Sequence, residues 1–143
     1  MDTKEYAKHF LEKIMKLPEN EDAFVVGLSG HLGVGKTAFT KEIAKIIGVK
    51  QEITSPTFVI MKIYETQNER WPRLIHIDAY RLESGEELQA IDFERLVSDK
   101  RNLILIEWPE NVQTILEGVE DIRLNISINK DGSRNYEEAW KNE

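Results

Sequence analysis

The chain has 143 residues, a formal net charge of −7 and no cysteine. This length suits a single domain over residues 1–143, with a charged tail expected from about residue 134. The missing cysteines exclude disulfides, thiolate metal sites and cysteine nucleophiles. The acidic charge argues against independent binding to DNA or RNA, because such binding draws on clusters of Lys and Arg. No apolar run is long enough for a membrane span, and no signal peptide is evident, so we expect a cytoplasmic protein without membrane attachment.

The N-terminal segment predicts a helix followed by a buried strand. Tyr6, Phe10 and Ile14 recur at helical spacing within residues 3–17. Residues 23–28 form a continuous apolar run, which is typical of a parallel strand covered on both faces. This strand leads directly into a glycine-rich loop.

The glycine-rich loop at residues 30–37 fits the phosphate-binding pattern G-x-x-x-x-G-K-[ST]. Its glycines let the backbone curl so that several N–H groups converge on phosphate oxygens. Lys36 is expected to contact the β- and γ-phosphates, and the Thr37 hydroxyl is expected to bind Mg²⁺. The nucleotide-binding residues predicted in this region are Gly30, His31, Leu32, Gly33, Val34, Gly35, Lys36, Thr37 and Ala38.

The rest of the chain predicts an alternation of strands and short helices. An amphipathic helix follows the loop and ends near Gly48. Further strands are predicted at residues 58–64, 74–77, 103–106 and 122–128, the last of them half-exposed and near the edge of the sheet. Short helices are expected within residues 84–97 and 111–116, and hairpin turns at residues 66–71 and 131–132. This order favours an α/β fold of the P-loop NTPase type, with a mostly parallel sheet, an antiparallel portion and helices on both faces.

Two acidic residues follow predicted strands and complete a candidate active site. Asp78 and Glu107 each come directly after an apolar run, and the carboxyl ends of parallel strands meet at one rim of the sheet. Glu107 stands where P-loop proteins place the acidic residue of their second motif, so we expect it to bind Mg²⁺ together with Thr37. Asp78 and Glu107 are the predicted catalytic residues, although a solvated position at a strand end is the alternative for each.

For several other polar and aromatic residues the sequence indicates a function less strongly. Trp108 could stack on an adenine or could occupy the core or rim. Thr57 lies in a loop that could supply a hydroxyl to the γ-phosphate, a role that residue chemistry alone leaves open. His31 and His76 have no carboxylate or histidine neighbour at ligand spacing, and both are interpreted as structural.

Several ordered motifs together resemble the TsaE family, also called YjeE. Besides the loop at residues 30–37, they are Thr54-Ser55-Pro56-Thr57-Phe58, His76-Ile77-Asp78-Ala79-Tyr80-Arg81-Leu82 and Ile106-Glu107-Trp108-Pro109-Glu110. The resemblance spans about residues 5 to 130. That family is a bacterial P-loop ATPase that acts with the TsaB and TsaD proteins in making threonylcarbamoyladenosine beside the tRNA anticodon.

The resemblance implies roles for particular residues. It implies that Lys36 and Thr37 bind phosphate and Mg²⁺, that Glu107 assists the metal and that Asp78 is needed for hydrolysis. It also implies that Thr57 belongs to a switch-like loop and that Trp108 lies near the base. The loop departs from the family where His31 replaces the usual Asp and Val34 the usual Ala, which puts in doubt any polar contact that the Asp makes.

The leading hypothesis is therefore a subunit that binds and hydrolyses ATP with Mg²⁺ and supports tRNA modification together with TsaB and TsaD, contacting tRNA only through these partners. One alternative is a small-molecule P-loop kinase, which usually needs an arginine-containing lid that is not evident here. Another is a nucleotide-gated binding module with negligible turnover.

Overall fold

The computed structural model describes residues 2–31, 33–53 and 60–141. Its strands form one six-stranded sheet in the order β2-β3-β4-β1-β5-β6. Strands β3, β4, β1 and β5 run parallel, and β2 and β6 pair antiparallel at the two edges. Their bounds are β1 Phe24–Ser29, β2 Met61–Glu65, β3 Arg73–Asp78, β4 Asn102–Glu107, β5 Ile122–Ile128 and β6 Arg134–Trp140. The predicted mixed sheet is thereby confirmed.

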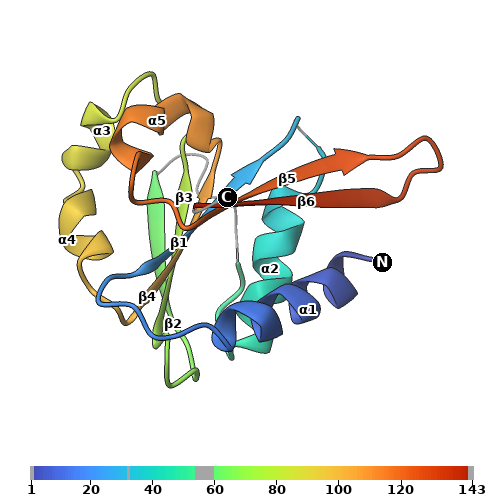
Figure 1. Cartoon of the computed structure of the whole chain (residues 1–143), viewed down its shortest axis with the longest axis horizontal. Helices are drawn as coiled ribbons and strands as arrows, with labels where there is room; N and C mark the ends of the chain where they lie inside the picture. Colours follow the sequence, from blue (N-terminus) through green and yellow to red (C-terminus); the bar gives the residue numbers. More distant parts are fainter. Residues whose placement is uncertain (1, 32, 54–59, 142–143) are drawn as a thin grey trace.

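Helices cover both faces of the sheet (Figure 1). Helices α1 (Thr3–Met15) and α2 (Lys36–Ile46) lie on one face, where they share a core with the inward side chains of the strands. The opposite face carries a set of shorter helices and a second core; they are α3 Glu86–Gln89, α4 Phe93–Val97, the 3-10 helix η1 Pro109–Val112 and α5 Gln113–Leu116. The central strands β1 and β4 are mostly apolar between their ends, as expected for strands buried on both faces of the sheet.

The local signals at the helix ends explain where α1 and α2 begin and end. The Asp2 carboxylate accepts a hydrogen bond from the Glu5 N–H at 2.8 Å and so caps α1. Helix α2 begins right after Gly35, whose φ of 109° lies in the left-handed region, and it ends just before Gly48, with φ 85°. No helix in the described part of the chain is long and apolar enough to cross a bilayer.

The C-terminal segment is a strand rather than a charged tail. Residues 134–140 pair with β5 through the turn around Gly132, so the predicted hairpin is confirmed and the tail expected from residue 134 is wrong. Side chains on one face of β6 enter the core region: Tyr136 stacks on Tyr6 with ring centroids 4.0 Å apart. Because β6 takes the edge position, β5 is the second strand from the edge.

Candidate nucleotide site

The glycine-rich loop joins the carboxyl end of β1 to the start of α2. Gly30, Gly33 and Gly35 all have positive φ angles, of 149°, 82° and 109°, which side chains rarely adopt. A Cβ on Gly30 would come within 2.5 Å of the carbonyl oxygen of Ile126 in β5, so the loop lies directly against that strand. These conformations confirm that the loop turns tightly, as a phosphate cradle must.

Lys36 is buried in the loop that it follows, with only 5% of its surface exposed. Its Nζ donates to the carbonyl oxygens of Gly30 at 2.5 Å and His31 at 3.1 Å, and it lies 4.0 Å from the centre of the Trp108 ring. Burial lowers the pKa of Lys36, although the neighbouring carboxylates, Glu107 first among them, act in the opposite direction. The amine is thus a poorly solvated donor that an anion in the loop could attract.

Glu107 ends β4 and makes contacts to α2 and β3. The Thr37 hydroxyl lies 3.2 and 3.0 Å from the two carboxylate oxygens of Glu107. The His76 ring, which is fully buried, places Nε2 2.5 Å from Oε2 of the same carboxylate. Two residues predicted as metal ligands, Thr37 and Glu107, are therefore in direct contact.

Asp78 ends β3 and lies beside Glu107 in the register of the sheet. Its Oδ1 accepts a hydrogen bond from the Tyr80 N–H at 3.0 Å. Burial raises the pKa of Asp78 and the nearby Glu107 charge adds to this, while the hydrogen bond from the Tyr80 N–H and the charges of His76 and Lys36 oppose it. Both predicted catalytic carboxylates thus lie at the rim that carries the loop.

Trp108 has a left-handed backbone, with φ 61° and ψ 50°. Its ring contacts Lys36 and lies 5.2 Å from the Tyr80 ring. Stacking of Trp108 on a base stays a prediction. Among the other predicted residues, the Val34 side chain is buried, His31 is exposed and contributes its carbonyl oxygen, and Ala38 lies in the first turn of α2. Leu32 and Thr57, with the rest of the motif at 54–58, lie outside the described residues.

Two contacts at the site were not predicted from the sequence. His76 was interpreted as structural, and its buried ring contacts Glu107. It stands two positions before Asp78 in β3, and alternate residues of a strand share a face, so strand periodicity could have placed both on the α2 side. Arg134, which donates to the loop at Val34, comes from β6 and carried no local signal.

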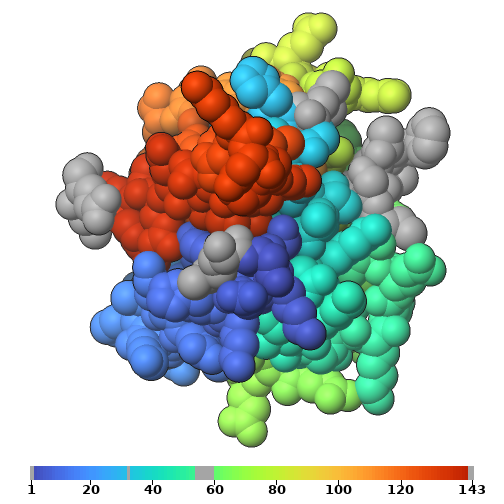
Figure 2. All heavy atoms as spheres, turned by 90° about the vertical axis from the view of Figure 1, so that its right-hand side faces the viewer, coloured from blue at the N-terminus to red at the C-terminus, as the bar shows by residue number. Residues whose placement is uncertain are grey.

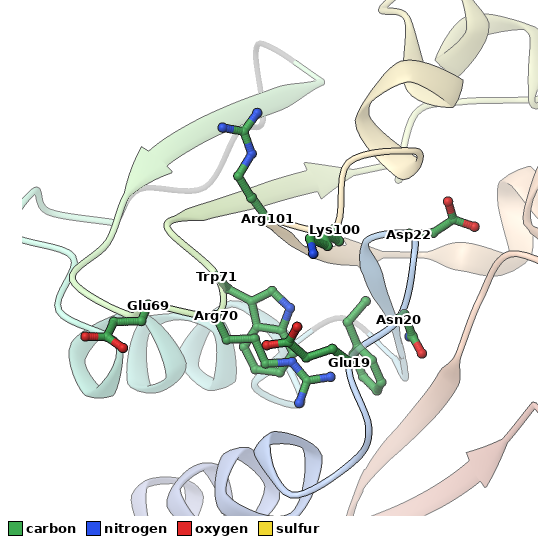
Figure 3. Close-up of a pocket in the computed structure, with 9 residues that line it drawn as sticks. Glu19, Asn20, Asp22, Glu69, Arg70, Trp71, Lys100 and Arg101 are labelled. Atoms are coloured by element: carbon green, nitrogen blue, oxygen red, sulfur yellow. The ribbon is translucent and has the colours of Figure 1, made fainter.

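A separate cavity of about 210 Å³ lies at the opposite end of the sheet, near the start of β1 (Figure 3). Arg70, one of three cationic residues that line it, donates to the carbonyls of Ile14 and Leu17 at the end of α1 and lies over the Trp71 ring, 4.6 Å from its centre. These contacts account for Arg70 as a residue that closes α1 onto the β2–β3 turn. The cavity brings together none of the predicted site residues.

The sheet order, the loop between β1 and α2, and the acidic residues at the strand ends define a P-loop-type α/β protein. The profile of the family described as "Threonylcarbamoyl adenosine biosynthesis protein TsaE" matches residues 1–136. The chain belongs to this family, which confirms the resemblance read from its motifs.

Individual relatives agree with this assignment. The tRNA threonylcarbamoyladenosine biosynthesis protein TsaE of Rickettsia bellii is 37% identical over 134 residues, which cover 93% of this chain and 85% of that protein. The protein of the same name from Haemophilus influenzae is 36% identical over 132 residues, covering 92% and 79%. The crystal structure of Bacillus subtilis YdiB superposes with a TM-score of 0.64 at 25% identity and covers 92% of this chain and 74% of that one.

Proposed function

We propose that this protein is the Mg²⁺-dependent ATP-binding and ATP-hydrolysing subunit of a system that makes tRNA threonylcarbamoyladenosine. The observation that carries the proposal is the contact between Thr37 at the start of α2 and Glu107 at the end of β4, beside the buried Lys36 amine. This pairing joins a hydroxyl and a carboxylate, the ligands that a hard cation takes beside a phosphate-binding loop.

The donor set fits a magnesium nucleotide. Mg²⁺ typically binds one or two protein oxygens and takes its remaining ligands from phosphates and water. When bound, the ion would neutralise charge on the phosphates. Thr37 and Glu107 would hold it.

The remaining residues have distinct roles in this proposal. Lys36 exchanges its bonds to the carbonyls of Gly30 and His31 for phosphate oxygens, which are stronger acceptors because they are charged. Asp78 orients the attacking water and accepts its proton, a role that its position beside Glu107 and its raised pKa support. The Trp108 ring packs against the Lys36 amine beside the loop.

The partners in this proposal are TsaB and TsaD. With a net charge of −7, the chain itself offers little attraction to tRNA phosphates. The tRNA is therefore held by the partner proteins, and this subunit acts on them through its nucleotide state.

The test is phosphate release from ATP by the full chain, alone and with TsaB, TsaD and tRNA, followed together with formation of the modified nucleoside. We expect the partners to stimulate release and Lys36→Ala to abolish both signals, while Lys45→Ala on the exposed end of α2 leaves both intact. Phosphate release that the partners leave unchanged, with modification indifferent to Lys36→Ala, would contradict the proposal. Transfer of the γ-phosphate to a small acceptor would favour a kinase instead.

A further inference from the structure

Strand β6 presents alternate side chains toward the face that carries α1 and α2. Tyr136 stacks on Tyr6, and Glu138 accepts hydrogen bonds from Tyr6 and Lys13. Arg134 begins the same series, because residues two apart on a strand share a face. In the space-filling view of Figure 2 the hairpin of β5 and β6 (red) lies above α1 (blue) and adjoins the segment of the glycine-rich loop (cyan).

The Arg134 guanidinium contacts the glycine-rich loop. Its Nε donates to the carbonyl oxygen of Val34 at 2.7 Å, and Nη1 donates to the carbonyl oxygen of Gly132 at 3.1 Å. The second bond lies within the hairpin turn and fixes the guanidinium relative to it. The side chain therefore ties the loop to the hairpin across 100 residues of sequence.

The bonded carbonyl belongs to the peptide unit that joins Val34 to Gly35. In a trans peptide the C=O and the N–H point in opposite directions. Holding the Val34 carbonyl toward the hairpin consequently turns the Gly35 N–H away from it. The N–H groups of such a loop are the donors that cradle phosphate oxygens, so their direction governs affinity.

Glycine makes this peptide unusually free to rotate, which is why an external anchor matters. Gly35 has a φ of 109°, and the atom nearest to a Cβ built there is Arg134 Nε at 3.5 Å, an ordinary contact distance. Steric contacts at Gly35 therefore do not fix the orientation of this peptide. The Val34 side chain, 5% exposed, packs in the same core cluster as Ile126 of β5. The Val34 side chain is therefore buried in a core that β5 shares, and its carbonyl is bonded to Arg134 of the hairpin.

We infer that Arg134 is a positioning residue for nucleotide binding, because it orients the Val34–Gly35 peptide so that its N–H faces the phosphates. The inference rests on the proposed function and adds the β5–β6 hairpin to the nucleotide site. It assigns Arg134 no direct contact with the nucleotide.

The experiment is calorimetric titration of ADP with Mg²⁺ into the full chain, its Arg134→Gln and Arg134→Lys variants, and Arg123→Gln as the matched control. Arg123 lies on the same hairpin but bonds to Glu120 and Gln113. We expect Arg134→Gln to lose roughly tenfold in ADP affinity, as for one hydrogen bond from a charged donor. Arg134→Lys keeps the charge and a donor, so it should recover part of the loss, and Arg123→Gln should bind as the parent does.

Salt separates positioning from simple charge attraction. Salt screens an exposed arginine that only attracts phosphates, so the deficit of Arg134→Gln would then vanish at high ionic strength. An orienting hydrogen bond keeps the same ratio of affinities at low and high salt. Affinity of Arg134→Gln within twofold of the parent, an equal loss in Arg123→Gln, or a deficit that salt removes would each overturn the inference while leaving the proposed function in place. A parent chain that binds no ADP would overturn both.

Discussion

His76 Nε2 lies 2.5 Å from Oε2 of Glu107, and both side chains are buried. An ionised carboxylate only accepts hydrogen bonds, so with Glu107 ionised the proton of this contact lies on Nε2. The other ring nitrogen, Nδ1, has no hydrogen-bond partner among the described residues. Among the described residues the His76 ring therefore makes one hydrogen bond, and this bond orients the Glu107 carboxylate toward Thr37.

That contact gives a matched pair of substitutions. Gln can place its amide nitrogen near the position of Nε2, whereas the shorter Asn reaches only the position of Nδ1. We expect His76→Asn to leave the Glu107 carboxylate without this donor, to lower the free energy of unfolding by about 1–3 kcal/mol and to weaken Mg²⁺-dependent ATP binding. His76→Gln should retain more of both. Urea denaturation and calorimetry measure the two effects, and equal behaviour of the two variants would count against an orienting role.

Trp108 offers an optical signal for the state of Lys36. The Lys36 amine lies over the Trp108 ring, and we expect nucleotide to draw it toward the phosphates and so change the fluorescence of that ring. Trp108→Phe should remove the change on ADP addition, and Trp140→Phe, at the far end of β6, should preserve it. A change that survives in Trp108→Phe would show that the signal comes from another tryptophan and does not report on Lys36.

Gly30 and Gly33 separate steric crowding from backbone strain. A Cβ on Gly30 meets a backbone oxygen of Ile126 at 2.5 Å, whereas a Cβ on Gly33 meets no described atom within 4 Å. We expect Gly33→Ala to lower the free energy of unfolding by about 1–2 kcal/mol through its positive φ alone. Gly30→Ala adds overpacking and should lose roughly 2–5 kcal/mol. Equal losses in urea denaturation would contradict the close approach of the loop to β5.

Glu138 predicts a pH dependence of stability. Burial acts against its ionised form, but hydrogen bonds from Tyr6 at 2.5 Å and Lys13 at 2.9 Å outweigh it and lower the pKa of Glu138. A carboxyl with a lowered pKa in the folded state stabilises the fold above its unfolded pKa and loses that contribution as the pH falls through the folded pKa.

We therefore expect the free energy of unfolding of the parent chain to fall more than that of Glu138→Gln as the pH drops below about 5. Urea denaturation at several pH values measures this, with Glu137→Gln on the exposed face of β6 as the control. Parallel pH profiles for the parent and Glu138→Gln would show that the contacts from α1 do not depend on the charge.

The sequence predicted the rim of the site well because each signal was local. The loop pattern places Thr37 at the start of a helix, and the apolar runs place Asp78 and Glu107 at strand ends. Because the carboxyl ends of parallel strands share one rim of the sheet, Thr37 and Glu107 were expected close together, and in the structure they are in contact. The contact of His76 with Glu107 was not predicted, because Glu107 is 31 residues away in the sequence and comes beside His76 only through the pairing of β3 and β4.

The error at the C-terminus has a physical cause. Glu137 and Glu138 read as part of a solvated tail, yet Glu138 is satisfied by Tyr6 and Lys13, more than 120 residues away. Burial of a glutamate on a strand face depends on those distant donors. The same long-range pairing brings Arg134 to the loop. Local composition could therefore predict neither the strand β6 nor the contact of Arg134 with the Val34 carbonyl.

The most direct test of the nucleotide site is a calorimetric titration of ATP in Mg²⁺ and in EDTA with the parent chain, Glu107→Gln and the control Glu117→Gln, an exposed position after α5. We expect Mg²⁺ to strengthen ATP binding by roughly tenfold or more in the parent and the control. Glu107→Gln should lose this gain while its affinity in EDTA stays close to that of the parent. A parent chain that does not bind ATP, or a Glu107→Gln variant that keeps the full effect of Mg²⁺, would contradict the account.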